Sequence, residues 1–510
     1  MYKIQLECTI ENKYPFNSAS SLKYFSKKEI VELTIFKLLN NRILGLLLLL
    51  LIFPNSLCFS HQIKRVSPKI AELRDSNISI TLTDSFDVIH PFLSVNAGIL
   101  PSDLESRKKI ANILFDTGVR EVLTSDLFKR FDLNGIYPDL KADPENLSSY
   151  NFSKSDEVFR FITDNGFEPF LKLGNSFGGC IPSSNIEMKN LINASINILR
   201  HYREGKWNGF RKVIRNVEIW NEPDVEKFWP KNLLPFNEFF VLFLNGLQKA
   251  FPDIKFGGPG FSPDVLENSK KHNPVRKFLA FLKENGVKPD FLSWHCFPED
   301  PIYFYEKCVL INGFLKSEKM DGVKNYVSAW NVHEIGREGK IDDFKRAALL
   351  ASCWVVIQDA KISNAVIFRA SATAEDFPRS WELISDSGKP TPSSVAFAFL
   401  GLLSDCTNRM KLVASDESLN FVSDPTSDRI KPVWMIAGKN PKTGLMRLLI
   451  SNIGEQKITC SLNIPKVFSF KPVTLKVREI SSPTNLIKSS ASEKAVFTVN
   501  PWSVTLVDIE

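Results

Sequence analysis

The chain has 510 residues, of which 44% are hydrophobic and 24% are charged, and these proportions are ordinary for a soluble globular protein. Its length allows one large domain with its own core and a smaller accessory domain. Its 64 Lys and Arg residues and 57 Asp and Glu residues give a net charge of +7, with no long cationic run. This mild charge argues against nucleic acid or an anionic membrane surface as the main partner.

The first segment, residues 1–60, reads as an N-terminal extension followed by a secretory signal. Residues 43–53, ILGLLLLLLIF, form an apolar run of 11 residues, whereas a membrane-spanning helix needs about 20. A basic residue precedes the run and small residues follow it, which predicts cleavage near residues 58–60. An uncleaved signal anchor is the alternative. We therefore expect an exported protein that is periplasmic, secreted or at the cell surface.

The cysteines after this segment are scattered and show no CxxC spacing, so neither a zinc site nor a dense disulfide framework is indicated. One or two disulfide bridges remain compatible with an oxidising compartment. No metal and no organic cofactor is suggested. The six cysteines concerned are Cys180, Cys296, Cys308, Cys353, Cys406 and Cys460.

From residue 87 to residue 405 short apolar runs alternate with longer amphipathic ones, a pattern typical of parallel strands joined by crossover helices. Eight strand candidates are present, the number that closes a (β/α)8 or TIM barrel, so the predicted fold class is α/β. The strand candidates are 87–93, 119–124, 168–173, 216–221, 254–258, 290–295, 325–330 and 364–369. Helical patterns include 155–165, 188–204, 236–250, 275–285 and 342–360.

The pattern changes in residues 406–510, where short runs of alternating or β-branched composition are separated by turn sequences such as GKNPKTG and SSPTN. This composition predicts an all-β accessory domain, most simply a β-sandwich packed on the barrel. The lead-in at residues 61–86 contains ISITLT, which could add a strand to it.

The sequence VEIWNEPD, residues 217–224, places a carboxylate at the end of the fourth strand candidate. Catalytic groups of TIM barrels lie at the carboxyl ends of the strands. Burial raises the pKa of a carboxyl group, and Glu222 would then suit the role of a general acid. Asn221 could bond a sugar hydroxyl, and Pro223 ends the strand. A helix-capping or salt-bridged Glu222 is the alternative.

Several longer segments of the chain resemble glycoside hydrolase family 39 of clan A, which includes β-xylosidases and α-L-iduronidases. IWNEPD is similar to the acid/base motif of that family, and the similarity covers roughly residues 86–510. The other segments that carry it are NFSKSDEVFRFITDNGFEPFLKLG (151–174), IKFGGPGFSP, DFLSWHCFP (290–298), LISDSGKPTPSSVAFAFLGLL (383–403) and the C-terminal NPWSVTLVDI.

The resemblance implies a retaining mechanism, in which two carboxyl groups about 5 Å apart flank the glycosidic bond. It gives Glu222 the acid/base role with Asn221 beside it. It also implies that His295, which ends the sixth strand candidate, bonds to the sugar. From the residues alone, His295 could equally be a satisfied core histidine.

The position that the resemblance gives to the second carboxylate is occupied by Ala329, in NYVSAWNVHEIG. A methyl group can neither attack an anomeric carbon nor stabilise an oxocarbenium charge. Phe297 stands where the family has a Tyr, and Phe368 with Arg369 stands where it usually has a Trp. Three such differences together indicate a reorganised site.

Three explanations of this departure stay open. Glu334, in the loop after the seventh strand, could substitute as nucleophile or base, or be a solvated loop residue. The cleft could bind sugar without cleaving it, which would make the chain a catalytically lapsed binding protein or polysaccharide-assembly factor. Finally, Asp126, Glu375 or Asp376 could supply the missing acid, although each fits a structural role.

The substrate-binding candidates are Asn221, His295, Trp330 and Arg369. Arg369 could pair with an anionic sugar or form an internal ion pair. Aromatic side chains near the strand ends could stack on sugar rings. We expect a carbohydrate ligand, and the sequence identifies neither the sugar nor the oligomeric state. The aromatic candidates are Phe177, Trp229, Trp294, Phe297, Trp330, Phe377 and Trp381.

Overall fold

A computed structural model of the chain describes the barrel and the β domain. The described residues are 69–98, 103–125, 130–175, 179, 181–231, 234–266, 273–332, 342–371, 381–385, 387–420, 429–464, 474–481, 488–492 and 495–510. The predicted signal lies outside these ranges, as does the rest of residues 1–60. Nowhere in these ranges does a helix have the length and apolar character needed to cross a membrane.

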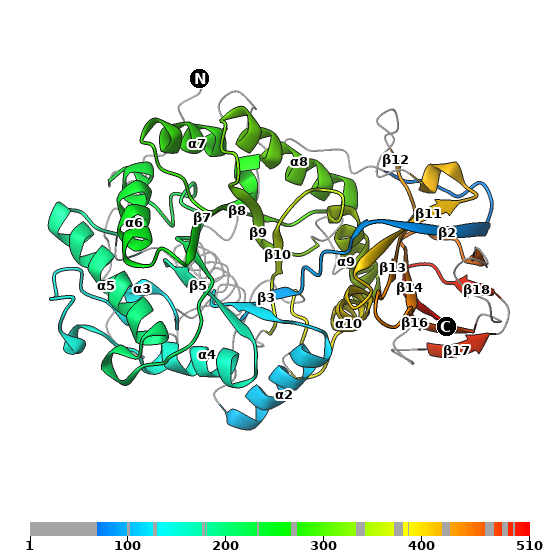
Figure 1. Cartoon of the computed structure of the whole chain (residues 1–510), viewed down its shortest axis with the longest axis horizontal. Coiled ribbons are helices and arrows are strands. Elements are labelled where there is room, and N and C mark those ends of the chain that lie inside the picture. Colours follow the sequence, from blue (N-terminus) through cyan, green and yellow to red (C-terminus); the bar gives the residue numbers. More distant parts are fainter. Residues whose placement is uncertain are drawn as a thin grey trace, which may run out of the picture. The chain divides into compact units, whose positions relative to one another are not determined.

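Eight parallel strands close into a barrel, in which each strand pairs with the next along the chain and the last pairs with the first (Figure 1). The predicted α/β barrel is therefore confirmed. The strands are β3 (Ser94–Asn96), β4 (Glu121–Leu123), β5 (Glu168–Leu173), β6 (Asn216–Ile219), β7 (Lys255–Phe261), β8 (Phe291–Cys296), β9 (Lys324–Trp330) and β10 (Asn364–Ile367).

The first predicted barrel strand, 87–93, was wrong. Residues 87–88 instead end the long strand β2 (Asn77–Val88), which belongs to the β domain, and the barrel begins at β3. The apolar residues Phe92 and Leu93 are buried in the barrel core although they lie in a connecting segment. The segment is apolar because it is buried, and this composition resembles that of a strand.

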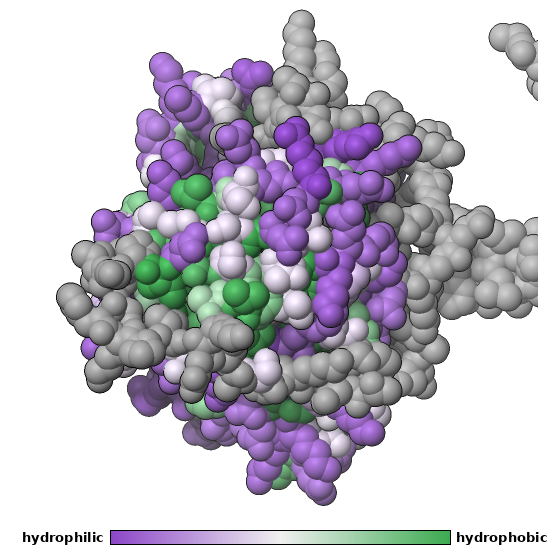
Figure 2. All heavy atoms as spheres, turned by 90° about the vertical axis from the view of Figure 1, so that its right-hand side faces the viewer, coloured by the Kyte–Doolittle hydropathy of each residue, from purple (hydrophilic) through white to green (hydrophobic). Residues whose placement is uncertain are grey.

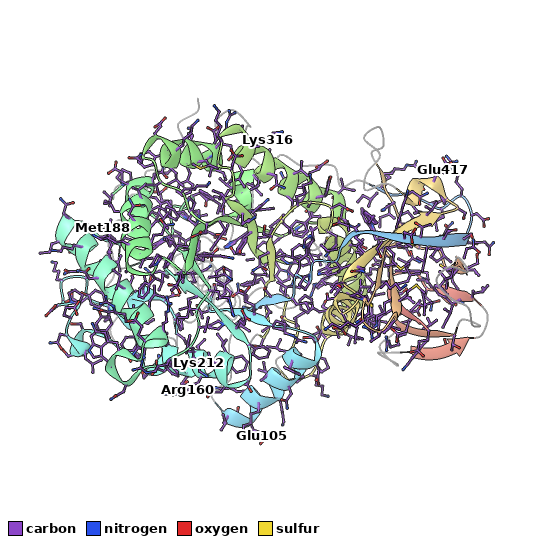
Figure 3. All side chains as sticks on the ribbon, viewed as in Figure 1. Glu105, Arg160, Met188, Lys212, Lys316 and Glu417 are labelled. Carbon is purple, nitrogen blue, oxygen red and sulfur yellow. The ribbon has the colours of Figure 1, made fainter. Side chains whose placement is uncertain are left out.

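The helices pack around the outside of the barrel, and several of them start at a side-chain cap. The carboxylates of Asp103 and Asp300 accept hydrogen bonds from the backbone N–H groups of Ser106 and Tyr303. Figure 3 places Glu105, Arg160 and Lys316 at the periphery of this ring. The helices are α2 (Leu104–Asp116), α3 (Leu133–Ile136), α4 (Ser153–Asp164), α5 (Asn185–Arg203), α6 (Phe236–Ala250), α7 (Pro274–Glu284), α8 (Pro301–Ser317), α9 (Asp343–Ile357) and α10 (Pro392–Ser404).

The β domain is one sheet of nine strands in the order β17-β16-β19-β14-β13-β11-β2-β15-β18. A turn at residues 500–502 joins β18, at one edge, to β19 near the other, so the sheet folds back on itself around an apolar core. Its other strands are β11 (Asn408–Ala414), β13 (Val433–Lys439), β14 (Met446–Asn452), β15 (Ile458–Asn463), β16 (Leu475–Ile480), β17 (Lys488–Ser492), β18 (Val496–Val499) and β19 (Ser503–Ile509). A short pair, β1 (Lys69–Ile70) with β12 (Arg429–Ile430), stands beside it.

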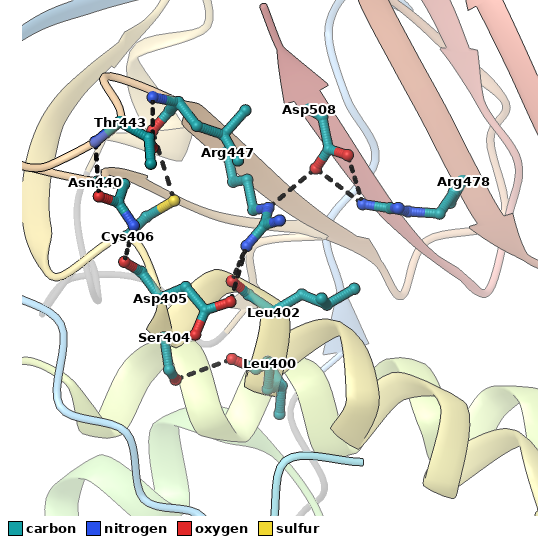
Figure 4. Close-up of polar contacts among 11 residues, drawn as sticks. Leu400, Leu402, Ser404, Asp405, Cys406, Asn440, Thr443, Arg447, Arg478 and Asp508 are labelled. Atoms are coloured by element: carbon teal, nitrogen blue, oxygen red, sulfur yellow. Dashed lines mark hydrogen bonds and ion pairs between the residues drawn. The ribbon is translucent and has the colours of Figure 1, made fainter. Parts of the chain in front are cut away.

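Polar contacts join the barrel helices to the β domain (Figure 4). The Arg447 guanidinium bonds to Asp508 at 3.0 Å, lies 3.3 Å from Asp405 and donates to the Leu402 carbonyl at the end of α10. Asp508 also accepts two bonds from Arg478. In the view onto the β domain, apolar residues gather in the centre with hydrophilic residues around them (Figure 2).

The five described cysteines, Cys296, Cys308, Cys353, Cys406 and Cys460, are all buried and free. No disulfide therefore joins any two of them. Cys180 lies outside the described residues.

Candidate active site

The turn after β6 presents the Asn221–Glu222 pair at the carboxyl end of the barrel. The Trp220 ring is fully buried and packs edge-on against Trp229 and Phe239, with ring centroids 5.0 and 5.2 Å away. Trp220 and Glu222 both have positive φ, at 75° and 45°. Such backbone angles are uncommon for residues other than glycine. The buried ring and a hydrogen bond from Glu222 N–H to the Gly260 carbonyl, at 2.9 Å, hold the turn in this shape.

Glu222 and His295 meet at this end of the barrel. Glu222 Oε1 and His295 Nδ1 are 2.7 Å apart, which is a hydrogen-bond distance. One of the two atoms therefore carries the proton of this bond. The Glu222 side chain is 19% exposed and the His295 side chain is 6% exposed. A carboxyl group that is partly buried yet open to solvent on one side has the setting of a general acid/base.

Beneath this pair lies a buried ion pair that the sequence did not reveal. Lys172 Nζ lies 3.1 Å from Glu218 Oε2 and donates to Asn221 Oδ1 at 2.7 Å. Burial of Glu218 opposes its ionisation, but the Lys172 ammonium and the polar groups around the carboxyl outweigh this effect, and the pKa of Glu218 lies below its usual range. The only sequence signal was a charged residue inside each of two apolar strands, FLKL and VEI.

A second carboxylate near Glu222 was also missed. Asp224 accepts from the Ser262 N–H at 3.0 Å and from the Ser262 hydroxyl. Burial raises the pKa of Asp224. Because Ser262 holds both of its oxygens, Asp224 ties the turn after β6 to the end of β7.

Ala329 lies on the inner face of the barrel next to His295. The two residues pair in register on β8 and β9, and paired residues on adjacent strands project to the same face. A register shift just before this pair leaves Ser328 as an extra residue in β9. Ala329 is 4% exposed. Thus the strand end beside the Glu222–His295 pair carries a methyl group.

The prediction that Trp330 binds substrate was wrong. Its ring is fully buried and packs on Phe304 of α8, with centroids 5.2 Å apart, because the register shift turns Trp330 outward toward the helices. Trp294 and Trp229 are also core residues, and the Trp294 indole donates to Asn325 Oδ1. Asn331 donates to the backbone carbonyls of Phe368 and Trp381, which fixes the end of β9 against the end of β10.

Three half-buried aromatic side chains form a wall at the ends of β8 and β10. Phe297 stacks on Trp381 with centroids 4.7 Å apart and planes 18° apart, and Phe368 meets both rings edge-on. Arg369 is 1% exposed, and its guanidinium lies over the Phe368 ring at 5.3 Å. The backbone N–H of Arg369 donates to the Trp381 carbonyl. The predicted pairing of Arg369 with an anionic sugar does not fit this burial.

The remaining predicted site residues lie outside the described residues. They are Asp126, Phe177, Glu334, Glu375, Asp376 and Phe377.

Residues 131–328 match the family described as Glycosyl hydrolases family 39. The barrel is related to that family. A β-xylosidase of Caldicellulosiruptor saccharolyticus is 26% identical over 174 residues, and an α-L-iduronidase of Mus musculus is 28% identical over 159 residues. These matches cover 31% and 29% of this chain, and the chain spans 33% and 24% of the length of the two relatives.

The fold is that of solved glycosidases. A glucosidase structure from Croceicoccus marinus has a TM-score of 0.68 at 19% identity, and a monomeric β-xylosidase from Caulobacter crescentus has 0.60 at 15% identity. Each covers 85% of this chain and 99% of its own. The family 39 match includes Asn221, Glu222 and His295, and it ends one residue before Ala329.

Proposed function

We propose that this chain is a glycosidase that acts on O-glycosidic bonds of an oligo- or polysaccharide, with Glu222 as the general acid/base. The observation that carries the proposal is the Glu222 carboxyl at the carboxyl end of β6, partly exposed and 2.7 Å from His295. The relationship to family 39 supports it. The aromatic wall of Phe297, Phe368 and Trp381 offers apolar faces for a sugar ring.

Glu222 has two tasks in this chemistry. As an acid it transfers its proton to the glycosidic oxygen as the bond to the anomeric carbon breaks. In a retaining reaction it then acts as a base and removes a proton from the incoming water. The standard mechanism needs a second carboxylate, and Ala329 occupies its position. Glu334 is our candidate to replace it, either as the nucleophile or as the base toward a water in an inverting reaction.

A second function is favoured by Ala329 itself. Without a carboxylate about 5 Å from Glu222, glycosyl-enzyme formation is lost, while the cleft keeps its capacity to bind sugar. The chain would then be a catalytically lapsed carbohydrate-binding protein.

The first experiment compares the parent with Glu222→Gln on a panel of aryl glycosides. If the chain is a glycosidase, Glu222→Gln lowers kcat/KM by about 10²–10⁴-fold, because an amide cannot supply the proton. Glu226→Gln, which removes an exposed carboxylate four residues away, is the matched control and should retain full activity. Equal activity in Glu222→Gln and parent would refute the acid/base role.

The second experiment restores the missing group with Ala329→Glu, using Ala329→Gln as a control of similar size without charge. Hydrolysis gained only in Ala329→Glu supports the lapsed binding protein, since the rest of the site would then be competent. Hydrolysis already present in the parent, and abolished by Glu334→Gln, supports the substituted carboxylate.

Export remains a proposal that rests on the run at residues 43–53. Expression with and without residues 1–60, followed by cell fractionation, tests it. Retention of the full chain in the cytoplasm would contradict the proposal.

A further inference from the structure

Glu218 lies directly below the proposed acid/base pair, and it has a second neighbour besides Lys172. A Cβ atom added to Gly260 would lie 3.1 Å from His295 Nε2 and 3.3 Å from Glu218 Oε1. The ring nitrogen and the carboxylate therefore face the same small space, which is open only because residue 260 is a glycine. The positive φ of Gly260, 64°, also favours glycine at this position.

His295 thus lies between two carboxyl groups. Its Nδ1 is 2.7 Å from Glu222 Oε1, and its buried Nε2 has no hydrogen-bond partner at standard geometry among the described residues. The other groups near this centre are Lys172 from β5, Asp224 from the turn after β6, and the hydroxyls of Ser293 and Ser328 from β8 and β9. The oxygens of Glu218 likewise have no hydrogen-bond partner at standard geometry among the described residues, so the Glu218 carboxylate and Nε2 are two unsatisfied groups that border the same small space.

The cost of burying charge favours one protonation state of the Glu222–His295 pair. The Lys172 ammonium already compensates the Glu218 carboxylate, and both side chains are almost completely buried, at 4% and 0% exposed. An imidazolium would leave a buried positive charge or, with Glu222 ionised beside it, would add two more charges to a site that is already largely buried. A neutral ring that points Nε2–H toward Glu218 satisfies the carboxylate without any added charge, and Nδ1 is then a hydrogen-bond acceptor.

We propose that Glu218 is a positioning residue: it holds His295 in the tautomer protonated at Nε2, so that Nδ1 accepts a hydrogen bond from the protonated carboxyl of Glu222. This inference rests on the proposed function of Glu222 and assigns a task to a residue outside the cleft. In this arrangement the resting state of Glu222 is the proton-bearing form that a general acid requires. Lys172 keeps Glu218 ionised and, through Asn221, also fixes the neighbouring amide.

The test is ¹⁵N NMR of the protein labelled at its histidine rings, with the His295 signals assigned by their loss in His295→Asn. We expect the parent to carry its ring proton on Nε2 with Nδ1 unprotonated. Glu218→Gln should move at least half of the population to other protonation states, because the amide no longer favours Nε2–H. Glu121→Gln, at the opposite end of the barrel, should leave the His295 signals unchanged. A parent ring protonated at Nδ1, or a Glu218→Gln spectrum identical to the parent, would overturn the proposal.

If Glu218→Gln does not fold, the double variant Lys172→Met/Glu218→Met removes the ion pair as a unit and serves the same purpose. The NMR result needs no substrate, so it is separate from the outcome of the hydrolysis assays. If a glycoside is hydrolysed, Glu218→Gln should lower kcat/KM by about 10–100-fold.

Discussion

The two ends of the barrel each hold a carboxylate on an inner strand position, but they hold it in different ways. At the amino end Glu121 accepts hydrogen bonds from Ser94, Asn216 and Asn364 at 2.8–2.9 Å, all from neutral groups. At the carboxyl end Glu218 faces the charged Lys172 and lies near the His295 ring. The first carboxylate is satisfied within its own network, whereas the second is electrostatically linked to the proposed reacting pair.

An apolar layer separates these two environments. Leu123, Phe170, Phe291, Tyr326 and Val366 form their own buried cluster, in which the Phe291 and Tyr326 rings stack 4.3 Å apart. A cavity of about 300 Å³ opens on the amino-end side of this layer, beside Glu121 and Asn216. Since active sites of TIM barrels lie at the carboxyl end, this cavity is not the proposed site. A hydrogen-bonded carboxylate at one end can thus stabilise the fold without affecting the chemistry at the other.

The largest expected effect comes from breaking the Lys172–Glu218 pair. Lys172→Met leaves an uncompensated carboxylate in the barrel, and we expect the free energy of unfolding to fall by about 3–5 kcal/mol. Lys172→Met/Glu218→Met should recover most of this loss, because no buried charge remains. Urea denaturation of the three proteins measures both changes. If Lys172→Met is as stable as the parent, the buried Glu218 carboxylate does not need Lys172 as its partner.

A smaller effect is expected at the amino end. Glu121→Gln turns an amide NH2 toward neighbours that donate, so one or two hydrogen bonds are lost and the free energy of unfolding should fall by about 1–3 kcal/mol. Any hydrolytic activity should stay within about twofold of the parent, since the apolar layer intervenes. A large loss of kcat/KM in a stably folded Glu121→Gln would abolish the distinction between the two ends.

The ion pair at the carboxyl end should also make the free energy of unfolding depend on pH in the acidic range. Burial opposes ionisation of Glu218, but the Lys172 ammonium and the neighbouring polar groups leave its folded-state pKa lowered. A lowered carboxyl pKa contributes stability above the unfolded-state pKa of about 4.3, and that contribution is lost as the pH falls through the folded-state value. The stability difference between the parent and Lys172→Met/Glu218→Met should therefore be constant from pH 5.5 to 7 and change in favour of the double variant below about pH 4.5. A difference independent of pH would contradict the ionised state of Glu218.

The smallest expected effect concerns ligand binding at the carboxyl end. Phe297→Ala removes one ring from the aromatic wall and should weaken oligosaccharide binding by about 1 kcal/mol, or about fivefold in Kd. Tyr326→Phe, in the apolar layer, should leave Kd unchanged. Isothermal titration calorimetry distinguishes the two, and equal losses would place the ligand elsewhere.

Patterns within single segments predicted much of this fold. Short apolar runs between amphipathic segments located seven barrel strands, and the helix predicted at 236–250 matches α6 residue for residue. The IWNEPD motif located Glu222 because proline and the polar pair interrupt an apolar strand. His295 was located by its place at a strand end.

Relationships between segments could not be predicted in the same way. Lys172 and Glu218 lie 46 residues apart, and their pairing depends on the register of β5 against β6. Trp330 was assigned to the site because the extra residue in β9, which turns it outward, leaves no signal in the sequence. Asp224 directly follows the motif, yet its role depends on Ser262 of a different loop.

The route of the chain through the β domain has a practical consequence for dissecting the protein. β2 precedes the barrel but pairs with β11 and β15, which follow it, and residues 346–357 of α9 are all buried. A fragment ending at residue 405 would lack both strands that pair with β2. It would also expose buried residues of α9 to solvent. Studies of the barrel should therefore keep β2 and the C-terminal β domain, and should use single substitutions instead of truncations.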